Sequence, residues 1–141
     1  MNARNIVLTL LSLIVIIGLE GCADSTGKYT ITVNRTVKAC GIDDPTRNVA
    51  WLADYCTAHT PTNFTGITIS ISVYVHKVTG NNSYVMSYSN AQVVDYSSQE
   101  VYDCSGQKLF SKGNLDPAPA GWNEFFAAND LVAIIWEIKK D

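Results

Sequence analysis

The sequence predicts an α+β domain: an antiparallel β-meander of about five to six strands, packed by one helix, with a second short helix before the last strand. Three observations support this class. Apolar and polar residues alternate over Gly66–Val78. A helix start and an apolar stripe of helical period occupy residues 44–58. Turn-forming residues then separate the short β-rich segments of the second half.

The first part of the predicted domain contains one strand and the main helix. Tyr29–Lys38 alternates β-branched and polar residues, which predicts a strand. Asp44 and Pro45 are typical of a helix start, because aspartate accepts hydrogen bonds from the first turn and proline suits the first helical position. We expect this helix to run to about Ala58. Its apolar stripe contains Val49, Leu52 and Cys56.

The rest of the domain is predicted to be mostly strands. Gly66–Val78 is typical of a strand with one buried face and one wet face. Gly80-Asn81-Asn82 tolerates the backbone of a tight turn, so the next strand should return antiparallel. Further strands are predicted at Tyr84–Tyr88, Ala91–Tyr96, Glu100–Cys104, Gln107–Phe110 and Leu131–Ile138, and the second helix at Trp122–Asn129.

The first 22 residues have the pattern of an export signal. Asn2-Ala3-Arg4 precedes the apolar run Ile6–Gly18, and Leu19-Glu20-Gly21-Cys22 ends it. The run is short for a spanning helix, which needs roughly 20 residues. The pattern resembles a bacterial lipoprotein signal. That resemblance implies a signal peptide over residues 1–21 and acylation of Cys22. The small polar residues up to Lys28 predict a tether over residues 22–28, and the length of the remainder predicts one globular domain over residues 29–141.

Charge and composition narrow the classes of partner. The chain has 10 basic and 13 acidic residues and a net charge of −3, with the charges scattered singly. Nucleic-acid binding proteins concentrate positive charge, so we expect no nucleic-acid partner. The expected membrane contact is the lipid on Cys22, because buried acyl chains supply the affinity of such anchors.

Three further cysteines, Cys40, Cys56 and Cys104, lie in a chain whose export permits disulfides. The sequence allows three pairings. A helix between Cys40 and Cys56 would hold these two apart and disfavours their pairing, although the residues before the helix could double back. Cys56 also falls on the apolar stripe of that helix, where a free thiol behaves as a small apolar group. We therefore favour a Cys40–Cys104 bond with Cys56 free.

Three segments, in order, resemble a known family. They are Cys40-Gly41-Ile42-Asp43-Asp44-Pro45 with Asn48 and Trp51-Leu52, then Val101-Tyr102-Asp103-Cys104-Ser105-Gly106, and finally Ile134-Ile135-Trp136-Glu137. The pattern is similar to that of small lipoproteins of gut Bacteroidota-type bacteria, which have no established activity. The resemblance implies an outer-membrane lipoprotein and supports the Cys40–Cys104 pairing. Surface lipoproteins of such bacteria often carry an acidic run just after the lipid cysteine, whereas this chain has the single acid Asp24 there. The resemblance therefore implies the periplasmic face rather than the cell surface.

The sequence offers little for catalysis. His59 and His76 are the only histidines, and no His, Cys, Asp and Glu residues have the spacing of a metal site. Asp95, Glu100 and Asp103 are interpreted as residues of hairpins rather than as paired catalytic carboxylates. We therefore expect no metal, no cofactor and no catalytic residue, and an enzyme ranks third among the hypotheses.

The sequence supports a binding role better than a catalytic one. Tyr74 and His76 share the polar face of the long predicted strand, and Tyr84 and Tyr88 share one face of the next strand. If these faces coincide, they form a tyrosine-rich surface suited to a protein or a glycan. The alternative is that Tyr84 and Tyr88 pack inward with the isoleucines, since a one-residue shift of register exchanges the two faces. The leading hypothesis is a tethered, non-enzymatic binding module for a protein or glycan. The second is a structural or accessory envelope lipoprotein within a larger assembly.

Overall fold

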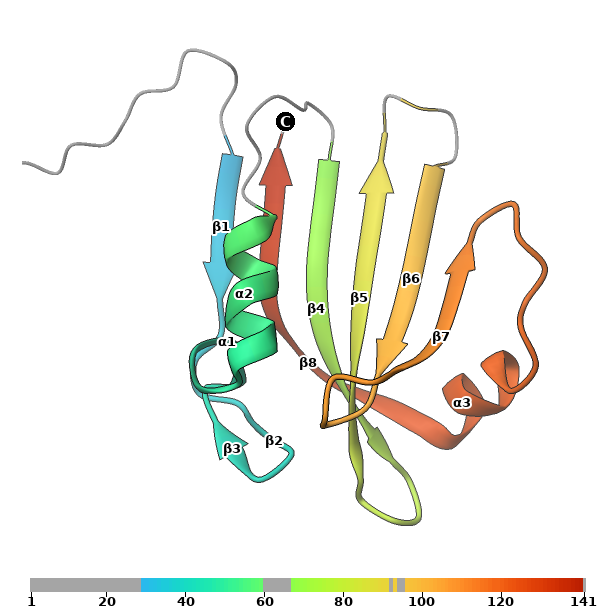
Figure 1. Ribbon diagram of the computed structural model, residues 1–141, viewed down its shortest axis with the longest axis horizontal. Helices are drawn as coiled ribbons and strands as arrows, with labels where there is room; N and C mark the ends of the chain where they lie inside the picture. Colours follow the sequence, from blue (N-terminus) through green and yellow to red (C-terminus); the bar gives the residue numbers. More distant parts are fainter. Residues whose placement is uncertain (1–28, 60–66, 92, 94–95, 141) are drawn as a thin grey trace, which may run out of the picture.

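The computed structural model describes residues 29–59, 67–91, 93 and 96–140 (Figure 1). The predicted signal peptide and tether lie outside these residues. The strands are β1 (Tyr29–Val33), β2 (Lys38–Ala39), β3 (Ile42–Asp43), β4 (Ile67–His76), β5 (Asn82–Asn90), β6 (Tyr96–Tyr102), β7 (Lys108–Gly113) and β8 (Asn129–Lys140). The helices are α1 (Pro45–Asn48), α2 (Ala50–Ala58) and α3 (Trp122–Ala128). Among the described residues, no helix is long and apolar enough to span a membrane.

The architecture is an antiparallel sheet with a few short helices, which agrees with the predicted α+β class. Six strands form the main sheet in the order β1-β8-β4-β5-β6-β7, while β2 and β3 form a separate small ribbon. The predicted meander is therefore present from β4 to β7. It does not extend to β8, which returns across the molecule and pairs with both β1 and β4. Ile135, Trp136 and Ile138 of β8 are buried, as the apolar character of this segment requires of an interior strand.

Three predicted strands differ from the strands of the structure. β1 ends at Val33, because Asn34 then accepts hydrogen bonds from the backbone and hydroxyl of Thr36 in a turn. The strands predicted at 91–96 and 100–104 are replaced by one strand, β6, and positions 92, 94 and 95 lie outside the described residues. β6 pairs with β5 along its whole length. This pairing places the polar residues Ser97, Ser98 and Gln99 in a strand, although their composition alone did not predict one.

The single helix predicted over residues 44–58 is two helices in the structure. Val49 between α1 and α2 is extended, with φ −101° and ψ 110°, and its side chain is buried. Asp44 does not cap α1 with its carboxylate, so that part of the prediction is wrong. The carboxylate instead accepts hydrogen bonds from Arg35 at 2.9 Å and from the Thr46 hydroxyl at 3.0 Å.

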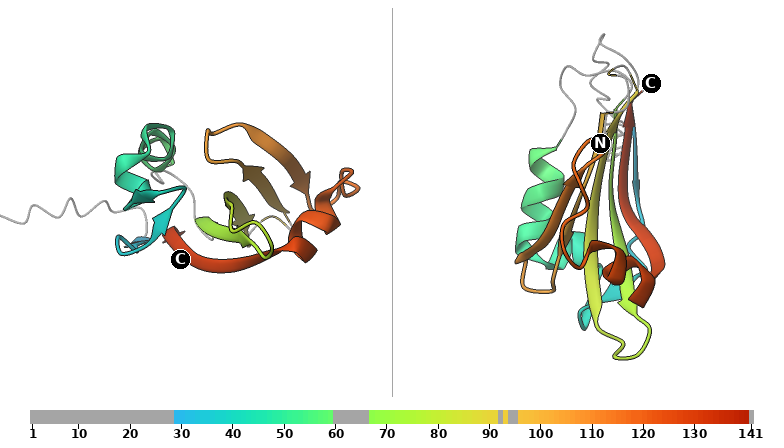
Figure 2. Two further views of the ribbon diagram at one scale, coloured as in Figure 1. Left: turned by 90° about the horizontal axis from the view of Figure 1, so that it is seen from below. Right: turned by 90° about the vertical axis from the view of Figure 1, so that its right-hand side faces the viewer.

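The helices cover opposite faces of the sheet. α2 lies against the face formed by the odd-numbered residues of β4, where Leu52 joins a buried cluster with Ile69 and Ile71. Figure 2 shows α2 along one side of the strands. α3 packs on the other face, where Trp122 contacts Val85 and Val101. This second helix was predicted, and Figure 1 shows it at the lower end of the sheet.

A disulfide joins Cys40 to Cys104, with 5.7 Å between their Cα atoms, and Cys56 is free. It links the β2–β3 turn to the β6–β7 turn, which are 64 residues apart in the sequence. Asn82 at the start of β5 strengthens the junction. Its side-chain oxygen accepts from the Cys40 backbone N–H at 2.9 Å. The bridge therefore connects the N-terminal ribbon and helices to the β6–β7 hairpin at the edge of the sheet.

The β6–β7 turn leaves no room for a side chain at Gly106. Gly106 has φ +87°, and a Cβ there would lie 3.0 Å from the Trp51 ring. Gly106→Ala is therefore expected to lower the free energy of unfolding by about 2–4 kcal/mol, through left-handed backbone strain and overpacking. Denaturant unfolding measures this loss. Gly80→Ala is the matched control, because Gly80 has φ +73° and open space around it. Equal losses in both variants would contradict the contact with Trp51.

Candidate functional site

The tyrosine-rich surface, one of the two alternatives left open by the sequence, does not form, because the register separates its members. Val73 pairs with Tyr84 and Ile69 with Tyr88, so both tyrosines share the face of the isoleucines. Tyr84 is completely buried, and Tyr88 packs against the same core. The alternative of inward packing is the arrangement in the structure.

The other two members of that predicted surface lie on the opposite face and have structural contacts. Tyr74 is half-buried and packs its ring against Phe125 and Phe126 of α3. The Nδ1 of His76 accepts hydrogen bonds from the backbone N–H groups of Val78 and Thr79, within the β4–β5 hairpin. Neither residue belongs to an open binding surface with Tyr84 and Tyr88.

The second histidine also has a local partner. His59 stacks on the Tyr55 ring at 4.0 Å, and its Nδ1 lies 2.8 Å from the Tyr55 carbonyl oxygen. Within the described part of the chain, no three His, Cys, Asp or Glu residues are grouped as metal ligands.

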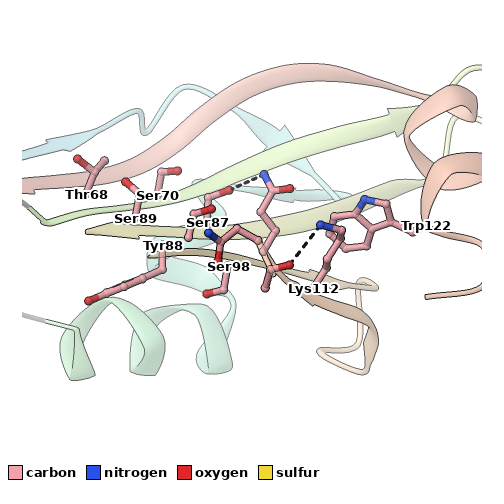
Figure 3. Close-up of a pocket in the computed structure, with 12 residues that line it drawn as sticks. Thr68, Ser70, Ser87, Tyr88, Ser89, Ser98, Lys112 and Trp122 are labelled. Atoms are coloured by element: carbon pink, nitrogen blue, oxygen red, sulfur yellow. Dashed lines mark hydrogen bonds between the residues drawn. The ribbon is translucent and has the colours of Figure 1, made fainter. Parts of the chain in front are cut away.

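A polar groove lies on the α3 face of the sheet, next to the part that α3 covers (Figure 3). It has a volume of about 360 Å³. Two crosswise rows of side chains form its floor, since residues paired across neighbouring strands share a face. The first row is Thr68, Ser89 and Ser97, and the second is Ser70, Ser87, Gln99 and Lys112.

The next row along the strands explains where the groove ends. Ser72, Val85, Val101 and Phe110 pair in sequence across β4 to β7, and α3 covers the apolar members of this row. Trp122 of α3 closes the groove at that end (Figure 3). Only 8% of its surface is exposed, so it offers an edge rather than an open stacking platform. Along the strands, this face of the sheet is therefore apolar and covered beside α3, and hydroxyl-rich and open beyond it.

The groove is weakly charged and supplies mostly neutral hydrogen-bonding groups. Gln99 donates from Nε2 to the Ser87 hydroxyl at 3.2 Å, and Lys112 donates from Nζ to the Gly113 carbonyl at 3.2 Å (Figure 3). Lys112 is the one cation among the residues that line the groove, and no carboxylate lines it. Such a surface can match the donors and acceptors of a polar ligand, but it brings together no acid–base pair.

Two of the carboxylates considered from the sequence serve the hairpin instead. Asp103 accepts from the backbone N–H groups of Ser105 and Gln107 and so holds the β6–β7 turn. Glu100 lies on the α2 face and accepts hydrogen bonds from Lys108 and from the Tyr102 hydroxyl. The third, Asp95, lies outside the described residues. No catalytic pair results from Glu100 and Asp103.

The Glu100 carboxyl gives the protein a small acid sensitivity. Its desolvation acts to raise its pKa, but the hydrogen bonds and charge of Lys108 and the Tyr102 hydroxyl outweigh this and lower the pKa below 4.5. A lowered pKa in the folded state means stability that is present above about pH 4.5 and lost as the pH falls below it. Glu100→Gln is thus expected to cost less than about 1 kcal/mol at pH 7, because the pair is partly exposed.

Unfolding by urea at pH 7 and pH 3 measures this effect. The difference between wild type and Glu100→Gln should shrink at pH 3. Glu124→Gln on α3 is the control for removing one carboxylate elsewhere. A difference that grows on acidification would contradict the role of the Lys108 pair.

The groove residues were partly visible in the sequence. The alternation of β4 predicts that Thr68 and Ser70 lie on a wet face. Ser87, Ser89, Ser97, Gln99, Lys112 and Trp122 were not identified. Ser87 and Ser89 alternate with the tyrosines of β5, and this spacing was the available signal.

The fold and the groove together define a class: an antiparallel sheet with helices on both faces and a hydroxyl-lined groove on one of them. No family model, no curated protein and no solved structure matches the chain.

Proposed function

We propose that the protein is an exported, lipid-anchored binding module that holds a glycan in the groove between the hydroxyl rows and Trp122. The observation that carries this proposal is the lining itself: five Ser and Thr side chains, Gln99 and Lys112 point to one open face. Sugar hydroxyls both donate and accept hydrogen bonds, as serine and threonine hydroxyls do. The site therefore suits a hydroxyl-rich ligand and gives no reaction chemistry.

The dimensions favour an oligosaccharide over a single sugar. The groove extends across β4 to β7, and neighbouring strands lie about 4.8 Å apart, so its floor is about 14 Å wide. Because Trp122 is largely buried, hydrogen bonds would supply most of the affinity. Each hydrogen bond contributes about 1 kcal/mol net, so a ligand must engage side chains of both rows at once.

Binding to a glycan array tests the proposal. Wild-type protein should bind a subset of oligosaccharides, and Ser87→Ala and Gln99→Ala should each weaken that binding roughly fivefold, as the loss of one hydrogen bond predicts. Thr32→Ala on β1 is the matched control, because it removes an exposed hydroxyl outside the groove. Binding to no glycan, or equal affinity of all three variants, would contradict the site.

The anchor is the second part of the proposal, and it is supported by the leader-like pattern that ends in Cys22. We place the protein in the outer membrane, on its periplasmic face, as a relative of the small lipoproteins that it resembles. Mass spectrometry of the mature N-terminus should find an acylated Cys22. Cys22→Ala should move the protein out of the membrane fraction, while Cys56→Ala should not. An intact Met1 would contradict this assignment.

A contact within a larger assembly is a second candidate function, and one edge of β8 favours it. β1 ends opposite Trp136, so within the described residues the segment 130–134 of β8 pairs only with β4. Leu131, Val132 and Ile134 there are 54, 51 and 46% exposed. Exposed apolar strand edges are typical of protein contacts. Val132→Lys should abolish co-purification of a partner and leave glycan binding unchanged.

A further inference from the structure

A second pocket lies on the α2 face of the sheet, away from the hydroxyl-lined groove. It has a volume of about 340 Å³ and is bounded by β1, β8, α1 and α2. Val33 and Trp136 are direct partners in the β1–β8 pairing and form its floor. Ala53 and Cys56, three residues apart on α2, form one wall. This part of the pocket is apolar.

The opposite rim is cationic. Arg35 is oriented by Asp44, whose carboxylate it contacts at 2.9 Å, and it keeps further N–H donors. Arg47 on α1 also lines the pocket and forms no ion pair within the described residues. The Asp44 carboxylate is occupied by Arg35 and the Thr46 hydroxyl. The rim therefore has one guanidinium that is fixed in place and one that is available for a ligand.

We infer that this pocket binds an anionic amphiphile, a molecule with a carboxylate or phosphate head and a short alkyl tail. The head pairs with Arg47 and with the remaining donors of Arg35, since the guanidinium fork matches both kinds of anion. The tail lies on Val33, Ala53 and Trp136. A sugar would place its hydroxyls on the apolar floor, where they would find no hydrogen-bond partners. A plain hydrocarbon would fill the floor but leave the two arginines without an anion. An anionic amphiphile matches both parts of the lining. This inference does not depend on the glycan proposal.

The pocket contains its own reporter, because the Cys56 thiol lines it and is the one free cysteine of the described residues. Burial raises the pKa of Cys56 to about 11, so the group is a thiol near neutral pH and reacts slowly with alkylating agents. A ligand that covers the wall should slow alkylation further. Peptide mass spectrometry after iodoacetamide treatment measures the rate at Cys56 itself.

The test compares four probes on the protein as isolated from cells: hexanoate, hexyl phosphate, hexanol and inorganic phosphate. Hexanoate or hexyl phosphate should slow alkylation of Cys56 at least fivefold at saturation, and lengthening the tail by one methylene should tighten binding about two- to fourfold. Protection by both identifies the anion class, and protection by one identifies the head group. Equal protection by hexanol, or by inorganic phosphate alone, would overturn the inference.

A charge-matched pair of variants completes the test. Arg47→Gln should weaken hexanoate or hexyl phosphate at least fivefold. Lys38→Gln removes one positive charge from an exposed side chain on β2, outside the pocket, and should have no effect. If the two variants weaken binding equally, the effect is one of net charge and the assigned head site is wrong. Failure of all four probes to protect Cys56 would overturn the pocket without affecting the glycan site.

Discussion

Replacing Cys40 and Cys104 together by serine is expected to lower the free energy of unfolding by about 4 kcal/mol. The bond closes a loop of 64 residues, and restricting a loop of that length in the unfolded chain accounts for a loss of about this size. A domain of this size has a total stability of about 5–15 kcal/mol. The loss of this one bond would therefore remove a large fraction of the free energy of unfolding.

The location of the bond predicts where the variant opens first. The β2–β3 ribbon is held to the sheet by the disulfide and by the hydrogen bond from the Cys40 N–H to Asn82. Denaturant unfolding gives the global loss, and limited proteolysis should cut first within residues 34–44. Cys56→Ser is the control, because it removes a half-buried free thiol and should cost less than about 1 kcal/mol. Equal midpoints for the two variants would contradict the expected result.

The sequence predicted correctly those elements whose structure is determined by their own residues rather than by distant contacts. The alternation from Ile67 to Val75 is present as β4, with Ile67, Ile69, Ile71 and Val73 buried. The interpretation of Asp103 as a hairpin residue is also confirmed, since Asp103 accepts from two backbone N–H groups of a turn in which Gly106 has φ +87°. In both segments the backbone preference and the side-chain chemistry agree, so no distant contact is needed to decide the structure.

Tertiary contacts decided the remainder of the fold. Val49 fits a helix by its spacing, yet its side chain is buried where the chain is extended between α1 and α2. The carboxylate of Asp44 binds Arg35, nine residues away, rather than the first turn. β6 begins at Tyr96 because β5 pairs with it over seven residues, a partner that local composition does not reveal.

The candidate site depended on register, and register is a property of two strands. The sequence predicted the two faces of β4 correctly, but it could not align β5 with β4. The pairing of Ser70 with Ser87 makes one row of hydroxyls, whereas a shift by one residue would have placed Tyr88 there. The groove needs three such alignments in addition to α3. No single serine in the sequence predicts that the strands align into these rows.

The same register makes Tyr84 a core residue, and Tyr84→Ala is expected to lower the free energy of unfolding by about 3–5 kcal/mol. Tyr84 has no exposed surface, lies beside Val73 in the sheet and meets the Trp51 ring edge-on at a centroid distance of 5.6 Å. Truncation leaves a cavity between the sheet and α2, because the neighbouring strands cannot collapse into it. Tyr74→Ala on the opposite face should cost less, since Tyr74 is only half-buried.

Tyr84→Phe separates the ring from its hydroxyl. The Tyr84 hydroxyl oxygen is buried and has no hydrogen-bond partner, so in the folded state it loses water and gains nothing in return. Removing it should leave stability unchanged or raise it by up to about 1 kcal/mol. Thermal unfolding of Tyr84→Phe, Tyr84→Ala and Tyr74→Ala ranks the three changes. A large loss of stability in Tyr84→Phe would show that the hydroxyl has a hydrogen-bond partner. A Tyr84→Ala variant as stable as wild type would place Tyr84 on the surface and would contradict the register of β4 and β5.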